Sequence, residues 1–188
     1  MRWEETLLGL FEDLEQQAQG LQLMDRDAEV AERSRAEYAR VDLASRFHAS
    51  VGGRVALGVL GIGTVTGSVA RVGADWCLLD TEAQQDWQQD WVVRLAAVRQ
   101  ARGLSPLAVS EGARSVVTRL GLGSVLREVA QAGSVAVVHH VDGAQTRGRL
   151  GRVGADFAEL HLAVHDHESG SGEVDVVPFG LIAAVRPG

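Results

Sequence analysis

The 188-residue chain has no lysine and no asparagine, and it has only one cysteine and three prolines. Its 18 basic residues are therefore all arginines, and 25 acidic residues outnumber them, for a formal net charge of -7. An acidic chain is a poor default partner for nucleic acid or an anionic membrane, because such binding needs clustered cations. The single cysteine, Cys77, excludes an internal disulfide and a cysteine-based zinc site.

Long apolar runs are also missing. The most apolar stretch, residues 55–70, is interrupted by glycines and hydroxyl side chains, and its length is marginal for a membrane span. The first residues, Met1–Glu5, are partly acidic and unlike a secretory signal. We therefore expect a cytoplasmic protein that does not contact a membrane.

One ten-residue motif occurs twice. Residues 67–76 (GSVARVGADW) match residues 148–157 (GRLGRVGADF), with six of the ten positions identical. A repeat of this kind indicates that one folding unit occurs twice. We assign the first copy to residues 42–103, a linker to 104–118 and the second copy to 119–188.

The region before the first copy, residues 1–41, has the pattern of a long helix. Between residues 4 and 40, apolar side chains recur at spacings of three, four or seven, and charged residues occupy the other face. This stripe favours either self-association as a coiled coil or packing of the helix on its own chain, and the sequence leaves both open.

Each copy reads as a short helix followed by five short strands. The helices are expected over residues 42–51 and 124–132, and Gly-rich turns separate the strands. The pattern predicts an α+β, mainly β protein: a long N-terminal helix followed by two small barrels. Small barrels expose strand edges, so we expect the two to pair edge strands or to bury one apolar face each.

The repeated motif resembles the first Sm motif. The matching positions are Gly67, Val69, Asp75, Trp76 and Leu79, and again Gly148, Leu150, Asp156, Phe157 and Leu160. This resemblance implies duplicated Sm-like (SH3-like) barrels. The whole chain is also similar to an uncharacterised family of actinobacterial proteins, which implies a lineage and no mechanism.

Sm-like RNA binders hold bases with an asparagine and with an arginine–glycine pair before the last strand. This chain has no asparagine, and Arg102-Gly103 follows the last expected strand of the first copy. The departures count against RNA binding of that type. We expect a non-enzymatic binding, scaffolding or regulatory protein, with a protein partner or a second copy of the chain bound through the helix or the barrel edges.

Two tryptophans are the candidates for partner binding. Trp87 lies in a polar loop, and Trp91 opens the next apolar segment. Exposed tryptophans on polar loops anchor protein interfaces or stack on bases. Alternatively, Trp87 folds back onto its own barrel or onto the helix.

The alternative function is an RNA- or DNA-associated regulator with an arginine-lined barrel rim. Its candidate residues are Arg71, Arg147, Arg149 and Arg152. Two of them belong to the repeated pairs Arg71–Asp75 and Arg152–Asp156. These pairs are either a ligand contact made twice or a structural turn, in which the acid caps backbone N–H groups and the arginine pairs with it or covers an apolar edge.

The remaining polar clusters give only weak indications of a metal site or a catalytic site. His161, His165 and His167 form the one metal-like cluster, a weak candidate because a Ser/Gly-rich loop surrounds it. His139 and His140 alternate along a strand, so at most one of them faces the core. No nucleophile constellation or phosphate loop is present, so we expect no enzymatic activity, no cofactor and no resident metal.

Overall fold

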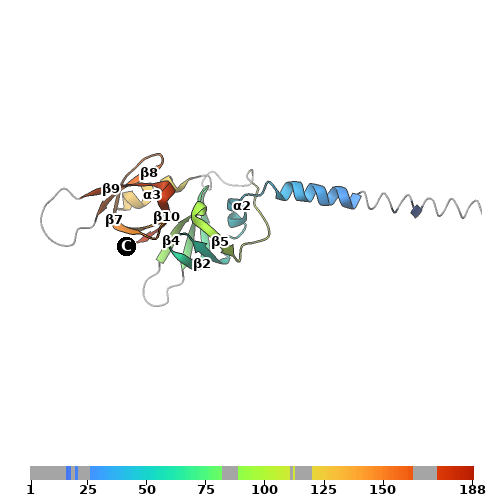
Figure 1. Ribbon diagram of the computed structural model, residues 1–188, viewed down its shortest axis with the longest axis horizontal. Coiled ribbons are helices and arrows are strands. Elements are labelled where there is room, and N and C mark those ends of the chain that lie inside the picture. The colour runs from blue at the N-terminus through green and yellow to red at the C-terminus, as the bar shows by residue number, and fades with distance from the viewer. Residues whose placement is uncertain are drawn as a thin grey trace, which may run out of the picture. The chain divides into compact units, whose positions relative to one another are not determined.

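The computed structural model describes residues 16, 17, 20, 26–81, 89–110, 112, 120–162 and 173–188 (Figure 1). The chain divides into two compact units, residues 1–41 and 42–188. The described helical residues of the first unit are 16, 17, 20 and 26–38. The prediction of one long N-terminal helix is wrong, and the longest helical run among the described residues of this unit is 26–38. Its side chains are exposed, and Arg33 pairs with Glu29 one turn earlier at 2.7 Å.

The described residues of the second unit form two short α-helices and ten strands. In chain order the elements are α2 (Leu43–His48), β1 (Arg54–Val59), β2 (Gly63–Val72), β3 (Trp76–Thr81), β4 (Gln89–Arg94), the 3₁₀ turn η1 (Leu95–Ala97), β5 (Val98–Arg102), α3 (Leu122–Ala132), β6 (Val135–His140), β7 (Gln145–Val153), β8 (Phe157–Leu162), β9 (Val174–Pro178), the 3₁₀ turn η4 (Phe179–Leu181) and β10 (Ile182–Pro187). The two copies thus have the same order of elements: a helix, four strands, a 3₁₀ turn and a fifth strand.

The prediction of two small barrels is wrong. All ten strands form one antiparallel sheet in the order β5-β1-β2-β3-β4-β10-β6-β7-β8-β9. The copies meet where β4 pairs with β10, through Val93 opposite Ala184 and Val92 opposite Val185. We call this pairing the internal junction.

Strands at the internal junction and next to it are buried on both faces, which explains the single sheet. In β4, Val93 belongs to the first core and Val92 packs against the second. Along β3, Cys77 and Leu79 belong to one core, while Trp76 belongs to the other and Leu78 packs against it. In β10, Ala183 and Ala184 belong to the first core, and Ile182 and Val185 to the second. Each half therefore completes the core of the other, as in sheets that have helices or strands on both sides.

The segment between the copies, expected as a linker, is held by α2 where the structure describes it. The Arg46 guanidinium donates two hydrogen bonds to the Ser105 carbonyl at 3.0 and 2.9 Å, and the Ser105 N–H donates to Ser50 Oγ at 2.9 Å. The helix itself begins at its predicted N-cap, where the Asp42 carboxylate accepts a hydrogen bond from the Ser45 N–H at 2.6 Å.

Candidate functional site

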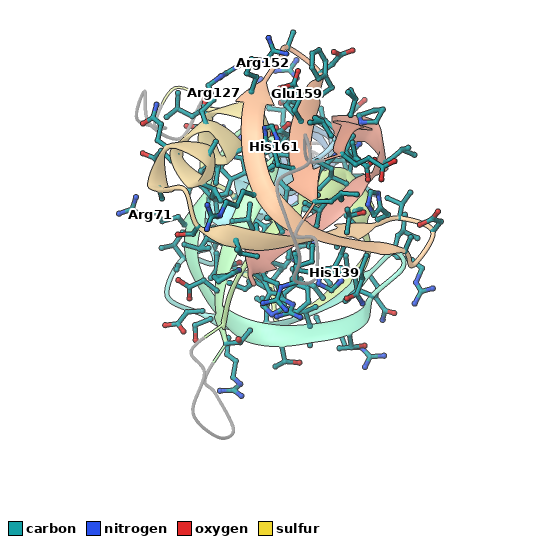
Figure 2. The ribbon with its side chains drawn as sticks, turned by 90° about the vertical axis from the view of Figure 1, so that its left-hand side faces the viewer. Arg71, Arg127, His139, Arg152, Glu159 and His161 are labelled. Carbon is teal, nitrogen blue, oxygen red and sulfur yellow. The ribbon has the colours of Figure 1, made fainter. Side chains whose placement is uncertain are left out.

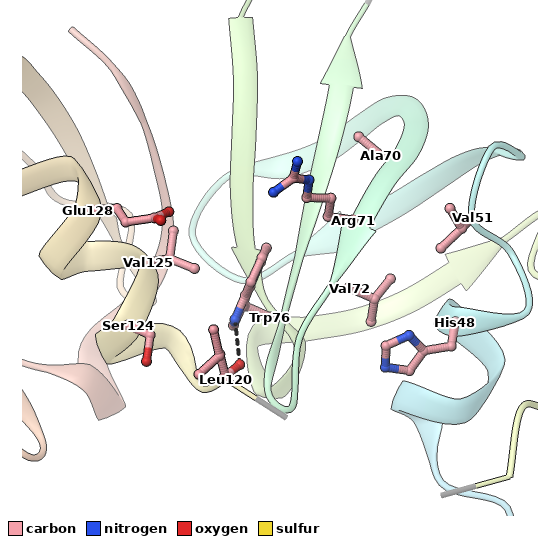
Figure 3. A pocket seen from close by; sticks show the side chains of 10 residues that line it. All are labelled: His48, Val51, Ala70, Arg71, Val72, Trp76, Leu120, Ser124, Val125 and Glu128. Atoms are coloured by element: carbon pink, nitrogen blue, oxygen red, sulfur yellow. Dashed lines mark hydrogen bonds between the residues drawn. The ribbon is translucent and has the colours of Figure 1, made fainter. Parts of the chain in front are cut away.

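A pocket of about 460 Å³ lies beside the first repeated turn, between α2 and α3 (Figure 3). Strands β2 and β3 supply Arg71, Val72 and Trp76, and the helices supply His48 on one side and Glu128 on the other. Its walls combine apolar side chains with a guanidinium, an imidazole and a carboxylate. Such a mixture of apolar wall and few polar groups is typical of a binding site.

The repeated turn fixes one wall of this pocket by binding the start of α3. The Asp75 carboxylate accepts a hydrogen bond from the Leu122 N–H at 2.7 Å. The Trp76 indole N–H and the Ala74 N–H both donate to the Leu120 carbonyl, at 2.9 and 3.1 Å. The N-cap of α3, Gly121, has no side chain, so Asp75 supplies the missing acceptor from the turn between β2 and β3.

Two glycines of the motif are needed because an aromatic ring lies too close to them for any larger residue. A Cβ on Gly73 would lie 2.1 Å from the Trp76 indole nitrogen, and one on Gly154 would lie 2.5 Å from the Phe157 ring. The aromatic residue therefore folds over its own turn in both copies. Asp75 thus accepts a hydrogen bond from a backbone N–H group, as the structural interpretation expects of the acid, but this N–H belongs to α3 and not to the turn.

The arginines of the two motifs have different surroundings. In the second copy, Arg152 donates two hydrogen bonds to the Glu159 carboxylate, each at 2.9 Å, rather than pairing with Asp156. The hydrogen bond from Arg152 lowers the pKa of Glu159, and the same contact raises the pKa of Arg152.

In the first copy the residue that corresponds to Glu159 is Leu78. Arg71 is exposed and forms no ion pair with any acid that the structure describes. Figure 2 places it apart from Arg152 and Glu159. The pocket therefore contains a guanidinium whose counterpart in the repeat already has a carboxylate partner.

The two helices carry the other polar groups of the pocket on opposite walls. His48 projects from α2, and Ser124 and Glu128 project from α3 (Figure 3). The arrangement can bind an anionic group at Arg71, with an apolar side chain beside Val72, Trp76 and Val125. Sequence reasoning identified Arg71 but missed the helix residues, because each lies far from the repeated motif along the chain.

Of the two tryptophans predicted to bind a partner, the structure describes one. Trp87 lies outside the described residues. Trp91 is half-buried at the internal junction, with its ring 4.8 Å from the His139 ring and the Arg186 guanidinium 5.8 Å from its centroid. Trp91 thus holds the two copies together, and its role toward a partner stays a prediction.

His139 itself is buried, with 5 % of its surface exposed. Desolvation lowers its pKa, as do the nearby charges of Arg186 and His140. The Arg186 Nε–H lies 3.2 Å from His139 Nε2 and donates to it. The lowered pKa favours the neutral imidazole, mainly because the ring is buried and also because it lies beside Arg186 of the same copy.

The nucleic-acid candidates do not form one rim. Arg147 and Arg149 are exposed at alternate positions of β7, and Arg152 is bound by Glu159. Of the predicted metal cluster, His165 and His167 lie outside the described residues, and His161 lies on β8, where a Cβ on Gly151 would meet its ring at 2.5 Å. Among the described residues, no group of three metal-binding side chains occurs.

No known protein-family model matches the chain, and no curated protein matches it in sequence. Within the described ranges, none of the helices has both the length and the apolar character needed to cross a membrane.

Proposed function

We propose that this is a non-enzymatic binding protein that acts in the cytoplasm and recognises a short segment of a partner protein in the pocket beside Arg71. The observation that carries the proposal is the difference between the repeated arginines. Arg152 is satisfied by Glu159, whereas Arg71 faces a pocket and has Leu78 at the corresponding place.

The chemistry of the pocket suggests the segment. A guanidinium binds a carboxylate through two parallel hydrogen bonds, and Arg152 forms that pair within this chain. The apolar wall of Val72, Trp76 and Val125 suits an aliphatic or aromatic side chain next to the acid. Glu128 on the opposite wall disfavours a ligand with several negative charges.

The nucleic-acid alternative is supported by Arg147 and Arg149, which point to the same side of β7. Two exposed arginines give a small electrostatic footprint compared with the several phosphate contacts of most nucleic-acid binders. With Arg152 neutralised by Glu159 and Arg71 placed elsewhere, we favour the peptide.

The test is a nuclear magnetic resonance titration that follows the Trp76 indole N–H, which forms part of the pocket wall. The probes are capped tripeptides, Leu-Asp-Val, Val-Glu-Leu and Phe-Asp-Leu, each matched with its Asn or Gln analogue. We expect at least one acidic peptide to shift this resonance saturably and its amide analogue to bind about tenfold more weakly, because a hydrogen bond to a charged group contributes about 1.5–3 kcal/mol.

Arg71→Gln should remove the preference for the acidic peptide, and the matched variant Arg152→Gln should keep it. Equal binding of acidic and amide peptides, or an unchanged preference in Arg71→Gln, would contradict the proposal. A single-stranded oligonucleotide that shifts resonances of β7, with no response to any peptide, would support the alternative.

A further inference from the structure

The ten-stranded sheet ends in two strands that correspond to the two strands of the internal junction. Among the described residues, β5 pairs only with β1, and β9 pairs only with β8. In the repeat, β5 corresponds to β10 and β9 corresponds to β4. The two free edges of the sheet, β5 and β9, are therefore the counterparts of the two strands that pair at the internal junction.

The correspondence extends to individual residue pairs. Ala101 lies opposite Leu57 in the first copy, as Val185 lies opposite Val138 in the second. Likewise Val176 lies opposite Glu159, as Val92 lies opposite Leu78. Both edge strands therefore pair with their inner neighbours in the same register as the two junction strands do.

We propose that a second copy of this chain pairs its β5 with β9 of the first, which reproduces the internal junction between molecules. Superposing the internal register on the free edges places Val176 opposite Ala101 and Val177 opposite Gln100. Continuing that register by one residue places Asp175 opposite Arg102, the positions that correspond to Trp91 and Arg186.

Charge complementarity supports this register. Inside the molecule the Arg186 guanidinium lies 5.8 Å from the centroid of the Trp91 ring. The corresponding intermolecular pair is Arg102 with Asp175, a base opposite an acid. Opposite charges at directly facing positions stabilise strand pairing, and like charges destabilise it.

Apolar exposure at the free end gives a second, independent argument. Val92 packs against the second core, while its counterpart Val176 is 60 % exposed. Trp76 inserts into the core of the other half, while its counterpart Phe157 is half-buried and belongs to neither core of the described residues. On the receiving half, Leu43 at the start of α2 is 42 % exposed. Intermolecular pairing would cover these side chains as internal pairing covers Val92 and Trp76.

The intermolecular pairing should be weaker than the internal one. Arg94 reinforces the internal junction by donating to the Gly180 and Ile182 carbonyls at 2.7 and 3.2 Å. Its counterpart is Pro178, which cannot donate, and proline on an edge strand limits how far pairing extends. Association is therefore expected to depend on concentration and to run head to tail, which gives rings or filaments.

Sedimentation of the full chain over a concentration series, with charge variants, tests the proposal. We expect concentration-dependent association of the natural chain, and about tenfold weaker association of Arg102→Glu and of Asp175→Arg, because each variant places like charges opposite each other. An equal mixture of the two variants restores opposite charges at every junction and should associate like the natural chain. A monomeric natural chain, or association that neither variant weakens, would overturn the proposal.

A disulfide trap tests the register directly. Burial raises the pKa of the Cys77 thiol to about 12, so this thiol does not compete with introduced cysteines. In the natural chain, Ala101→Cys with Val176→Cys should form intermolecular disulfides under oxidation and give a ladder on a non-reducing gel. The control, Gln100→Cys with Val176→Cys, is one residue out of register and should stay monomeric. Equal ladders from both, or no ladder from the first, would overturn the proposed register.

Discussion

The buried imidazole of His139 couples the internal junction to pH. Its folded pKa is lowered by desolvation, by Arg186 and by His140, while a histidine in an unfolded chain has a pKa of about 6.5. Just below that value the unfolded chain binds a proton that the folded chain does not. The free energy of unfolding therefore decreases as the pH falls through about 6.5, until the folded pKa is reached.

We expect the melting temperature to fall between pH 7.5 and pH 5.5, and to fall less in His139→Gln. The matched control is His161→Gln, which removes an exposed histidine on β8 and should keep the slope of the natural chain. Identical pH slopes in the natural chain and in His139→Gln would contradict this assignment.

At the same scale, the sequence predicted only part of the candidate site. Alternation along the strand correctly implied that at most one of His139 and His140 faces the core. The motif alone did not distinguish Arg71 from Arg152 as a candidate binding residue, since both copies have the same arginine. The difference lies in Leu78 and Glu159, seven residues farther along each copy, and became meaningful only when the structure showed Arg152 bonded to Glu159.

Among the elements, α3 depends on a residue outside itself. Its N-cap is Gly121, and the acceptor for the Leu122 N–H is the Asp75 carboxylate. Asp75→Ala should lower the free energy of unfolding by about 1 kcal/mol, the typical cost of removing a helix cap. The measurement is urea denaturation of the full chain.

The repeated acid Asp156 is the matched control for this cap. The Asp156 carbonyl accepts a hydrogen bond from the Phe179 N–H at 2.7 Å, and its carboxylate forms no hydrogen bond with a described residue. Asp156→Ala should therefore cost less than Asp75→Ala. Equal losses in both variants would mean that the acids serve the turn itself and not α3.

Elements were predicted better than their assembly. The helix–strand order, the N-cap at Asp42 and the two copies follow from local pattern and repetition. The pairing of the strands does not follow from local pattern, because burial on both faces determines which strands pair. The prediction of two closed barrels is wrong for this reason. Uninterrupted apolar runs, Trp76–Leu79 and Ile182–Val185, were the signal that β3 and β10 are covered on both sides.

For the whole molecule, residues 42–188 should unfold as one cooperative unit. Trp76 belongs to a strand of the first copy but lies in the core of the second, where it is 8 % exposed. Trp76→Ala should cost about 3–5 kcal/mol. Hydrogen exchange should then show lower amide protection in both copies. Phe157→Ala, at the corresponding half-buried position, should cost less, and loss of protection confined to one copy would contradict a shared core.

Strand order has a consequence for biosynthesis. During translation β10 emerges after the other nine strands, yet its place is between β4 and β6. Until then β4 and β6 each lack the strand that pairs with them on one side. The sheet is thus completed at its middle and not at its edges, and of these ten strands the last to be synthesised is the one that joins the two half-molecules.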